Sequence, residues 1–276
     1  MLPRYGSHGS MRKSDIDTAF DYAILGSGSS ANAYVIRFKG RALMVDNGFS
    51  LKETLARLAL AGIDPASLDG VFLTHTHGDH LRGVGPLCRR LKIPLFSAAG
   101  LTLPDSVGRI DQRYELSPGK SYRFSWMECL PFKTSHDADK SLGYSFTVAG
   151  ERISIITDTG EVSDEMAGLA AESRLLFLES NYDEQMLRTG PYPPFLQARI
   201  ASSRGHLSNL QAAELLQYLL QAGRPKKTYL CHLSDNNNDP RKVAETLQAA
   251  KLDGLSYKIA SRGELIRDIL SYKEAI

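Results

Sequence analysis

One short segment of this chain carries a high density of polar side chains directly after an apolar run. His75, His77, Asp79 and His80 lie within the six positions from 75 to 80, and residues 71–73 just before them are typical of a buried strand. The end of a strand can direct several side chains toward one place. We therefore expect this segment to lie at the edge of a sheet.

The spacing of these side chains predicts two neighbouring half-sites for metal ions. In an extended segment alternate side chains share a face, so His75 and His77 point the same way. Gly78 allows a sharp turn, after which Asp79 and His80 begin a helix and leave in another direction. Imidazole and carboxylate together suit zinc, iron or manganese. The alternative is a solvated polar loop.

Other polar side chains also stand at the ends of apolar, strand-like runs. They are Asp46 after residues 42–45, His136 after 127–132, Asp158 after 155–157, and His232 after 228–231. Each one alone could be a turn aspartate or a hydrogen-bonded loop histidine. Together with the dense cluster they predict a metal site built across the edge of a sheet.

The dense cluster resembles the HxHxDH signature of the metallo-β-lactamase superfamily. This resemblance implies an α/β fold, the αββα four-layer sandwich, and two divalent metal ions, with Zn²⁺, Mn²⁺ and Fe as candidates. It implies that His75, His77 and His136 hold one metal, that Asp79, His80 and His232 hold the other, and that Asp158 bridges them. Asp46 would support the cluster through hydrogen bonds.

Three further stretches are similar to the YycJ/WalJ-like branch of bacterial DNA exonucleases. They lie at residues 25–33, at 178–187, and at 190–193 leading on to 205–209. Two positions differ from that branch: Ala31 stands where glycine is usual, and Tyr182 where histidine is common, so Tyr182 is given no catalytic role. The resemblance implies a DNA exonuclease, with 5′-to-3′ digestion as one option. The residues themselves do not separate DNA from RNA.

His206 favours phosphodiester chemistry over the other reactions of the superfamily. A histidine ahead of a helix before the last metal ligand is similar to the tRNA-maturation nucleases of this superfamily. There it could protonate the departing 3′ oxygen or stabilise charge on the phosphate. Two cations about 3.5–4 Å apart would share a hydroxide that attacks phosphorus, with Asp79 and Asp158 orienting it. Alternatively, His206 is a helix-entry residue bonded to backbone, with Ser208 as the N-cap.

A loop rich in proline lies among arginines shortly before His206. Arg199 and Arg204 could neutralise phosphates, and Tyr192 or Phe195 could stack on a base for about 1–3 kcal/mol. The net charge of +2 and the pI near 8.3 do not by themselves justify a polyanionic partner. We expect Tyr192, Arg199 and Arg204 to contact nucleic acid, DNA rather than RNA. The alternative is an ordinary solvated surface.

Three other functions remain open. A thioester or lactam hydrolase, as in the glyoxalase II and β-lactamase branches, would direct the same hydroxide at a carbonyl and would have no evident use for His206. A β-CASP nuclease carries a large inserted domain, and the 74 positions from Asp158 to His232 already contain strands and helices. A metal-stabilised binding module would bind metal without catalysing any reaction.

The composition fits one enzyme domain. Of the 276 residues 42% are hydrophobic, and no linker rich in proline, glycine or serine divides them. Residues 1–19 are expected to be an N-terminal extension, in part derived from a vector, so that His8 has no chemical role, and residues 20–276 to be the catalytic domain. No run approaches the ~18 apolar residues of a membrane helix. Cys88, Cys129 and Cys231 suit buried thiols, so we expect a cytoplasmic protein without membrane contact.

Alternating strand and helix patterns predict two packed sheets with helices outside. Strands are expected near residues 22–25, 34–38, 43–46, 71–73, 144–148, 153–157, 175–179 and 228–231. Helices are expected near residues 51–61, 79–91, 165–171, 210–221 and 240–250.

Overall fold

The computed structural model describes residues 19–222, 227–252 and 254–271. The expected N-terminal extension up to residue 18, with His8, therefore lies outside the described residues. No helix within the described ranges is long and apolar enough to cross a membrane.

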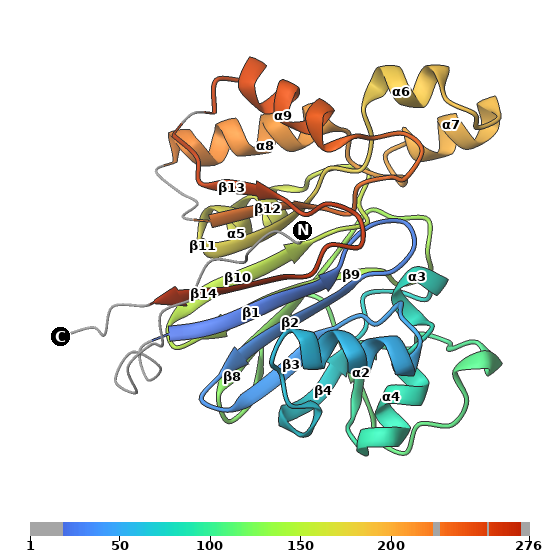
Figure 1. The fold of residues 1–276 in the computed structure, drawn as a ribbon, viewed down its shortest axis with the longest axis vertical. Helices are drawn as coiled ribbons and strands as arrows, with labels where there is room; N and C mark the ends of the chain where they lie inside the picture. Colours follow the sequence, from blue (N-terminus) through green and yellow to red (C-terminus); the bar gives the residue numbers. More distant parts are fainter. Residues whose placement is uncertain (1–18, 223–226, 253, 272–276) are drawn as a thin grey trace, which may run out of the picture.

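Two seven-stranded mixed sheets form the centre of the molecule (Figure 1). The first contains, in spatial order, β14 (Ile266–Ser271), β1 (Ala19–Gly26), β2 (Ala33–Phe38), β3 (Arg41–Val45), β4 (Leu68–Phe72), β5 (Leu95–Ala98) and β6 (Arg113–Leu116). The second contains β13 (Tyr257–Ile259), β12 (Lys227–Cys231), β11 (Ser173–Glu179), β10 (Glu151–Ile156), β9 (Leu142–Val148), β8 (Met127–Lys133) and β7 (Tyr122–Arg123).

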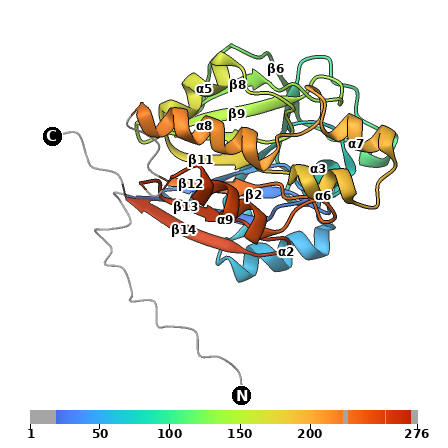
Figure 2. The same ribbon diagram turned by 90° about the horizontal axis from the view of Figure 1, so that it is seen from above.

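Helices cover the outer faces of both sheets. On the side of the first sheet lie α2 (Leu51–Leu60) and α4 (Val84–Leu91), and on the side of the second lie α5 (Asp164–Ala171), α8 (Asn209–Gln221) and α9 (Pro240–Ala249). Three short helices, α3 (Gly78–Leu81), α6 (Glu184–Thr189) and α7 (Pro194–Ile200), gather at one end of the sandwich (Figure 2). Two 3₁₀ turns, Pro65–Ser67 and Asp105–Val107, complete the described helical elements. The four-layer αββα sandwich expected from the resemblance is confirmed.

Aromatic side chains join the inner faces of the two sheets. Phe72 of β4 meets Tyr144 and Phe146 of β9 edge to face, with ring centroids 5.6 and 5.2 Å apart. Tyr22 of β1 packs in the same way on Phe177 of β11, at 5.8 Å. All five rings are buried, and such pairs stabilise by about 0.5–1.5 kcal/mol beyond their area. A second apolar cluster lies between the other face of the second sheet and α5, α8 and α9.

A polar contact joins the sheets along their other edge. Asp268 of β14 accepts hydrogen bonds from Lys227 Nζ at 2.6 Å and from the Tyr229 hydroxyl at 3.0 Å, both on β12. Burial alone would raise the pKa of Asp268, but the hydrogen bonds from Lys227, the backbone of Ile269 and Tyr229 lower it to about 2. Asp268 is therefore ionised at neutral pH and links the last strand to the second sheet.

Strand directions bring the ends of several strands to one edge. Strands β3 to β6 run parallel to one another, and so do β10 to β13. Strand β8 runs the same way as β10 because both are antiparallel to β9. Open sheets bind ligands outside the carboxyl ends of their strands, which is where the predicted ligands follow β3, β4, β8, β10 and β12.

The helix expected at residues 79–91 is broken into α3 and α4. Gly83 lies between them, and its N–H donates to Asn47 O at 2.8 Å. A Cβ at Gly83 would lie 2.1 Å from Phe49 O, so the helix bends where the loop after β3 presses against it. Gly78, where the sequence predicts a sharp turn, begins α3 and is not among the described glycines with a positive φ.

Several elements were not expected from the sequence: β5, β6, β7, β13, β14, α6 and α7. Most are short, and β7 and β13 span only two and three residues. The N-terminus of α8 does match the expectation. Ser208 Oγ accepts from Gln211 N at 3.2 Å while the Gln211 side chain accepts from Ser208 N at 2.9 Å, a capping box. His206 therefore has no capping role.

Candidate metal centre

The predicted ligands converge on one place at the end of the sandwich. Their ligand atoms form overlapping groups in which all members lie within 4.8 Å of one another. These groups are His75, His77 and His136; His75, His80 and Asp158; Asp79, His80 and His232; and Asp158, Glu179, His206 and His232. The first and third groups are the two half-sites that the resemblance implied.

Asp158 lies between the two half-sites. Its Oδ1 is 3.8 Å from His136 Nε2 on one side and 3.5 Å from His232 Nε2 on the other. Its Oδ2 is 3.4 Å from His80 Nε2. One buried carboxylate therefore faces both groups of imidazoles, as a bridging ligand would.

The backbone at three strand ends turns side chains into the centre. Asp46, Asp158 and His232 have φ values of 57°, 57° and 58°, in the left-handed region. A residue other than glycine held there costs on the order of 1–3 kcal/mol, and such positions cluster at functional sites. The backbone therefore adopts the same left-handed conformation at three of the residues that the sequence analysis identified after strands.

Asp46 stabilises the histidine cluster through hydrogen bonds. Its Oδ1 accepts from Thr74 N at 2.8 Å, and its Oδ2 accepts from the Thr74 hydroxyl at 2.8 Å. The same Oδ2 lies 2.7 Å from His80 Nδ1, while Thr74 Oγ1 lies 2.9 Å from His75 Nδ1. Both rings are held by Nδ1, which leaves Nε2 to face a cation. Asp46 thus makes hydrogen bonds of the kind that the resemblance implied for it.

The loop that carries Asp79 and His80 is held by direct backbone contact. Asn32 N donates to Asp79 O at 2.8 Å, and Asn47 N donates to His80 O at 2.7 Å. A Cβ at Gly48 would lie 1.8 Å from Asp79 O, so only glycine fits there. The close approach positions the second half-site relative to β3.

Glu179 is a functional candidate that the sequence reasoning missed. Its Oε1 lies 2.8 Å from His206 Nδ1 and 2.9 Å from His232 Nδ1, and its Oε2 accepts from Thr159 N and Leu207 N at 3.0 and 3.2 Å. Burial alone would raise the pKa of Glu179, but the charges and hydrogen bonds of His206 and His232 lower it below the usual range. The sequence did contain a signal for Glu179, because this residue ends an apolar strand, much as Asp46 and Asp158 follow apolar strands.

Two asparagines were also missed. Asn32 Nδ2 lies 3.3 Å from Asp79 Oδ2 and 3.1 Å from His80 Nε2. Asn181 Nδ2 donates to His232 O at 2.8 Å. Both lie in stretches that carried the resemblance, but the residue type alone does not mark them as site residues.

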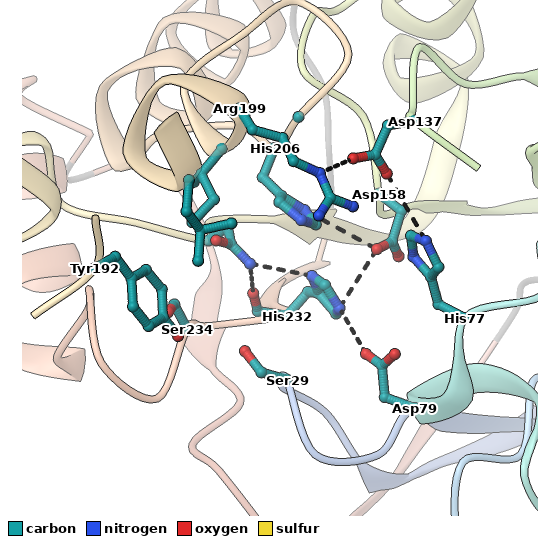
Figure 3. Close-up of a pocket in the computed structure, with 14 residues that line it drawn as sticks. Ser29, His77, Asp79, Asp137, Asp158, Tyr192, Arg199, His206, His232 and Ser234 are labelled. Carbon is teal, nitrogen blue, oxygen red and sulfur yellow. Dashed lines mark hydrogen bonds and ion pairs between the residues drawn. The ribbon is translucent and has the colours of Figure 1, made fainter. Parts of the chain in front are cut away.

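A pocket of about 220 Å³ opens beside the two half-sites (Figure 3). Tyr192 and Arg199 line it together with His206, whereas Arg204 does not. Arg204 Nη2 instead donates to His136 O at 3.3 Å, so this side chain supports the loop of a predicted ligand. Phe195, the other aromatic candidate for stacking, is 75% exposed on α7 and is not part of the lining.

The side chains in the centre fit divalent cations. Within the described part of the chain, His75 Nε2, His232 Nε2 and Asp158 Oδ2 are buried without a hydrogen-bond partner. Burial lowers the pKa of His75 and of His77, so both are neutral and able to bind a cation. Burial would also lower the pKa of His232, but Asp158 and other carboxylates raise it to about 10. The buried carboxylates thus attract positive charge, and the whole donor set fits a dinuclear divalent metal site.

Comparisons with known proteins agree with this geometry. Residues 41–233 match the model of the family described as "Beta-lactamase superfamily domain". Exodeoxyribonuclease WalJ of Streptococcus pneumoniae is 35% identical over 254 residues, which cover 88% of this chain and 94% of WalJ. Exodeoxyribonuclease YycJ of Bacillus anthracis is 34% identical over 221 residues, covering 79% of this chain and 83% of YycJ.

A solved structure supports the fold. The metallo-β-lactamase fold protein YhfI of Bacillus subtilis superposes with a TM-score of 0.68 at 18% identity, covering 91% of this chain and 100% of YhfI. At this identity the likeness concerns the fold alone.

Proposed function

The chain belongs to the metallo-β-lactamase superfamily and to its WalJ/YycJ-like group, and on this premise we propose that it is a DNA exonuclease. As a member of this group the chain is a metal-dependent hydrolase, and its relatives indicate a nuclease. The proposal concerns the finer points: the substrate, the direction of digestion and the role of each residue.

Each half-site would hold one of two divalent cations. His75, His77 and His136 would hold the first, Asp79, His80 and His232 would hold the second, and Asp158 would contact both. When bound, such a pair supplies the charge that activates water and polarises a phosphodiester. The carboxylates of Asp79 and Asp158 would accept hydrogen bonds from the attacking water and so orient it toward phosphorus.

The observation that carries the nuclease proposal is the pairing of His206 with Glu179. His206 lines the pocket, and because its Nδ1 is bound to Glu179 Oε1 at 2.8 Å, Nε2 is the ring nitrogen left free to act on a substrate. His206 Nδ1 is also 4.0 Å from Asp158 Oδ1, so the ring stands beside the reacting centre. We propose that Nε2 delivers a proton to the departing 3′ oxygen. A lactam or thioester hydrolase would have no evident use for it.

The pocket walls favour a nucleotide as the bound group. Tyr192 offers a ring for a base or sugar, and its hydroxyl accepts from Asn236 Nδ2 at 2.9 Å, which fixes the ring. Stacking of a base on such a ring is worth about 1–3 kcal/mol. We propose DNA as the substrate because the relatives WalJ and YycJ are exodeoxyribonucleases, and 5′-to-3′ as the direction of digestion.

The proposal is tested by a panel of substrates. Wild type and Asp79→Ala proteins, each with Mn²⁺, are given linear duplex DNA, single-stranded RNA of the same sequence, and a glutathione thioester. We expect DNA to be degraded fastest and all degradation to cease with Asp79→Ala. Faster hydrolysis of RNA would contradict the choice of substrate. Hydrolysis of the thioester alone, or of nothing, would contradict the nuclease function itself.

A further inference from the structure

Arg199 and Asp137 form an ion pair at the mouth of the pocket. Arg199 Nε, from α7, donates to Asp137 Oδ2, and both residues line the pocket (Figure 3). The other oxygen of Asp137, Oδ1, lies 3.8 Å from His77 Nε2 and 3.6 Å from His136 Nε2. Asp137 therefore stands between the guanidinium and the first half-site.

This pairing leaves most of the guanidinium available. A guanidinium has five N–H donors, of which Asp137 uses the one on Nε. Within the described part of the chain, the terminal nitrogens of Arg199 make no hydrogen bond to protein. The side chain is 57% exposed and the terminal donors border the pocket, so they remain free for a ligand. Two such donors match two oxygens of one phosphate.

The position of Asp137 decides which phosphate Arg199 can reach. A phosphate under attack lies at the half-sites, and the carboxylate of Asp137 lies between the first half-site and Nε of Arg199. A phosphate bound at this half-site therefore lies against the carboxylate of Asp137, which repels it on the side of Nε. The phosphate next along the strand carries the same charge and need not lie against this carboxylate, so the free terminal donors of Arg199 can bind it.

We propose that Arg199, held in place by Asp137, is a subsite for the phosphate adjacent to the one that is cleaved. The subsite rests on the proposed function, since it assumes a phosphodiester in the centre. Arg199 binds the neighbouring phosphate, and Asp137 is a positioning residue that fixes the guanidinium. The neighbouring phosphate lies either on the 5′ side, where it is the terminal phosphate of a 5′ end, or on the 3′ side.

Three thymidine dinucleotides distinguish a neighbouring phosphate on the 5′ side from one on the 3′ side. One has no terminal phosphate, the second has a 5′-phosphate, and the third has a 3′-phosphate, so that only the last two offer a second phosphate. With Mn²⁺ and wild type, we expect one of the two phosphorylated dinucleotides to be cleaved with a kcat/KM roughly tenfold or more above that of the unphosphorylated one. The preferred dinucleotide identifies the side of the subsite.

Variants of the ion pair test whether Arg199 and Asp137 cause the preference for a phosphorylated dinucleotide. Arg199→Gln should reduce this preference to within about twofold, because it should slow cleavage of the preferred dinucleotide far more than cleavage of the unphosphorylated one. Asp137→Asn should reduce it as well, mainly through KM, and should have no further effect in the Arg199→Gln background. Arg188→Gln, on the neighbouring helix α6 and outside the pocket lining, is the matched control and should leave the preference unchanged.

Several results would overturn the subsite. Equal cleavage of all three dinucleotides by wild type would do so, as would cleavage of duplex DNA but of none of them. Equal slowing of all three by Arg199→Gln would place Arg199 on the cleaved phosphate instead. Loss of Mn²⁺ binding by Asp137→Asn in equilibrium dialysis would make Asp137 a metal ligand. If neither DNA nor any dinucleotide is cleaved, the proposed function fails together with the subsite.

Discussion

Replacing Glu179 with glutamine should damage both catalysis and metal binding. The carboxylate now accepts hydrogen bonds from four groups, with His206 and His232 on Oε1 and two backbone N–H groups on Oε2. A glutamine has a single carbonyl oxygen, so its amide N–H₂ must face one of these two pairs. Whichever pair this is, two buried donors lose their acceptor.

The expected loss of stability follows from the two buried donors that lose their acceptor. A buried donor without an acceptor costs about 1–3 kcal/mol, so two give a loss of about 2–6 kcal/mol in the free energy of unfolding. If the amide faces the imidazoles, His232 can accept from it only by moving its proton to Nε2, the atom that a cation needs. Loss of such an orienting partner typically weakens metal binding by about 10–100-fold. Loss of an oriented His206 should lower kcat by about 10²–10⁴-fold.

Three measurements on Glu179→Gln test this reasoning. DNA hydrolysis is followed while Mn²⁺ is titrated, Mn²⁺ affinity is measured by equilibrium dialysis, and the free energy of unfolding is measured in urea. Glu184→Gln, an exposed glutamate in the first turn of α6, is the control and should behave as wild type in all three. A Glu179→Gln protein with wild-type kcat and Mn²⁺ affinity would refute the proposed role of the carboxylate.

Four other changes have defined outcomes. His206→Ala should lower kcat by about 10²–10⁴-fold with two Mn²⁺ still bound per chain, and loss of bound Mn²⁺ would show that it is a ligand or a structural prop. Gly48→Ala should lower the melting temperature by an amount equivalent to about 1–3 kcal/mol because its Cβ would meet Asp79 O. Gly168→Ala, in α5 with open space around its Cβ, should instead raise the melting temperature by an amount equivalent to about 0.5–1 kcal/mol. Asp268→Asn should be about 1.5–3 kcal/mol less stable than wild type at pH 7. Because the folded-state pKa of Asp268 is lowered to about 2, that difference should persist above pH 4 and vanish between pH 4 and pH 2, and a difference independent of pH would contradict the ionised link.

Much of the candidate centre could be predicted because its residues follow a simple local rule. Asp46, Asp158 and His232 each come directly after, or two residues after, an apolar strand, and the strands run so that these ends meet. The length and apolar composition of these strands can be recognised in the sequence, and so can the polar residues that follow them.

The partners of these residues could not be predicted in the same way. Glu179 ends a strand in the same manner, but its contact with His206 and His232 depends on β11 pairing with β12, and sequence alone does not give that pairing. The pairing of Asp137 with Arg199 depends on α7, a helix of seven residues behind a run of prolines that is typical of a loop. Likewise β14 pairs with β1 from the far end of the chain, and such distant pairing leaves no local signal.

The central claim is that the chain removes nucleotides one at a time from the end of DNA. The most direct measurement is a time course with duplex DNA labelled at either the 5′ or the 3′ end, with Mn²⁺ present and Asp79→Ala as the control. We predict that the 5′ label appears first as a mononucleotide, well before the 3′ label is released, and that neither appears with the variant. Early appearance of 5′-labelled fragments longer than a mononucleotide, release of the 3′ label before the 5′ label, or equal release by the Asp79→Ala protein, would contradict the account.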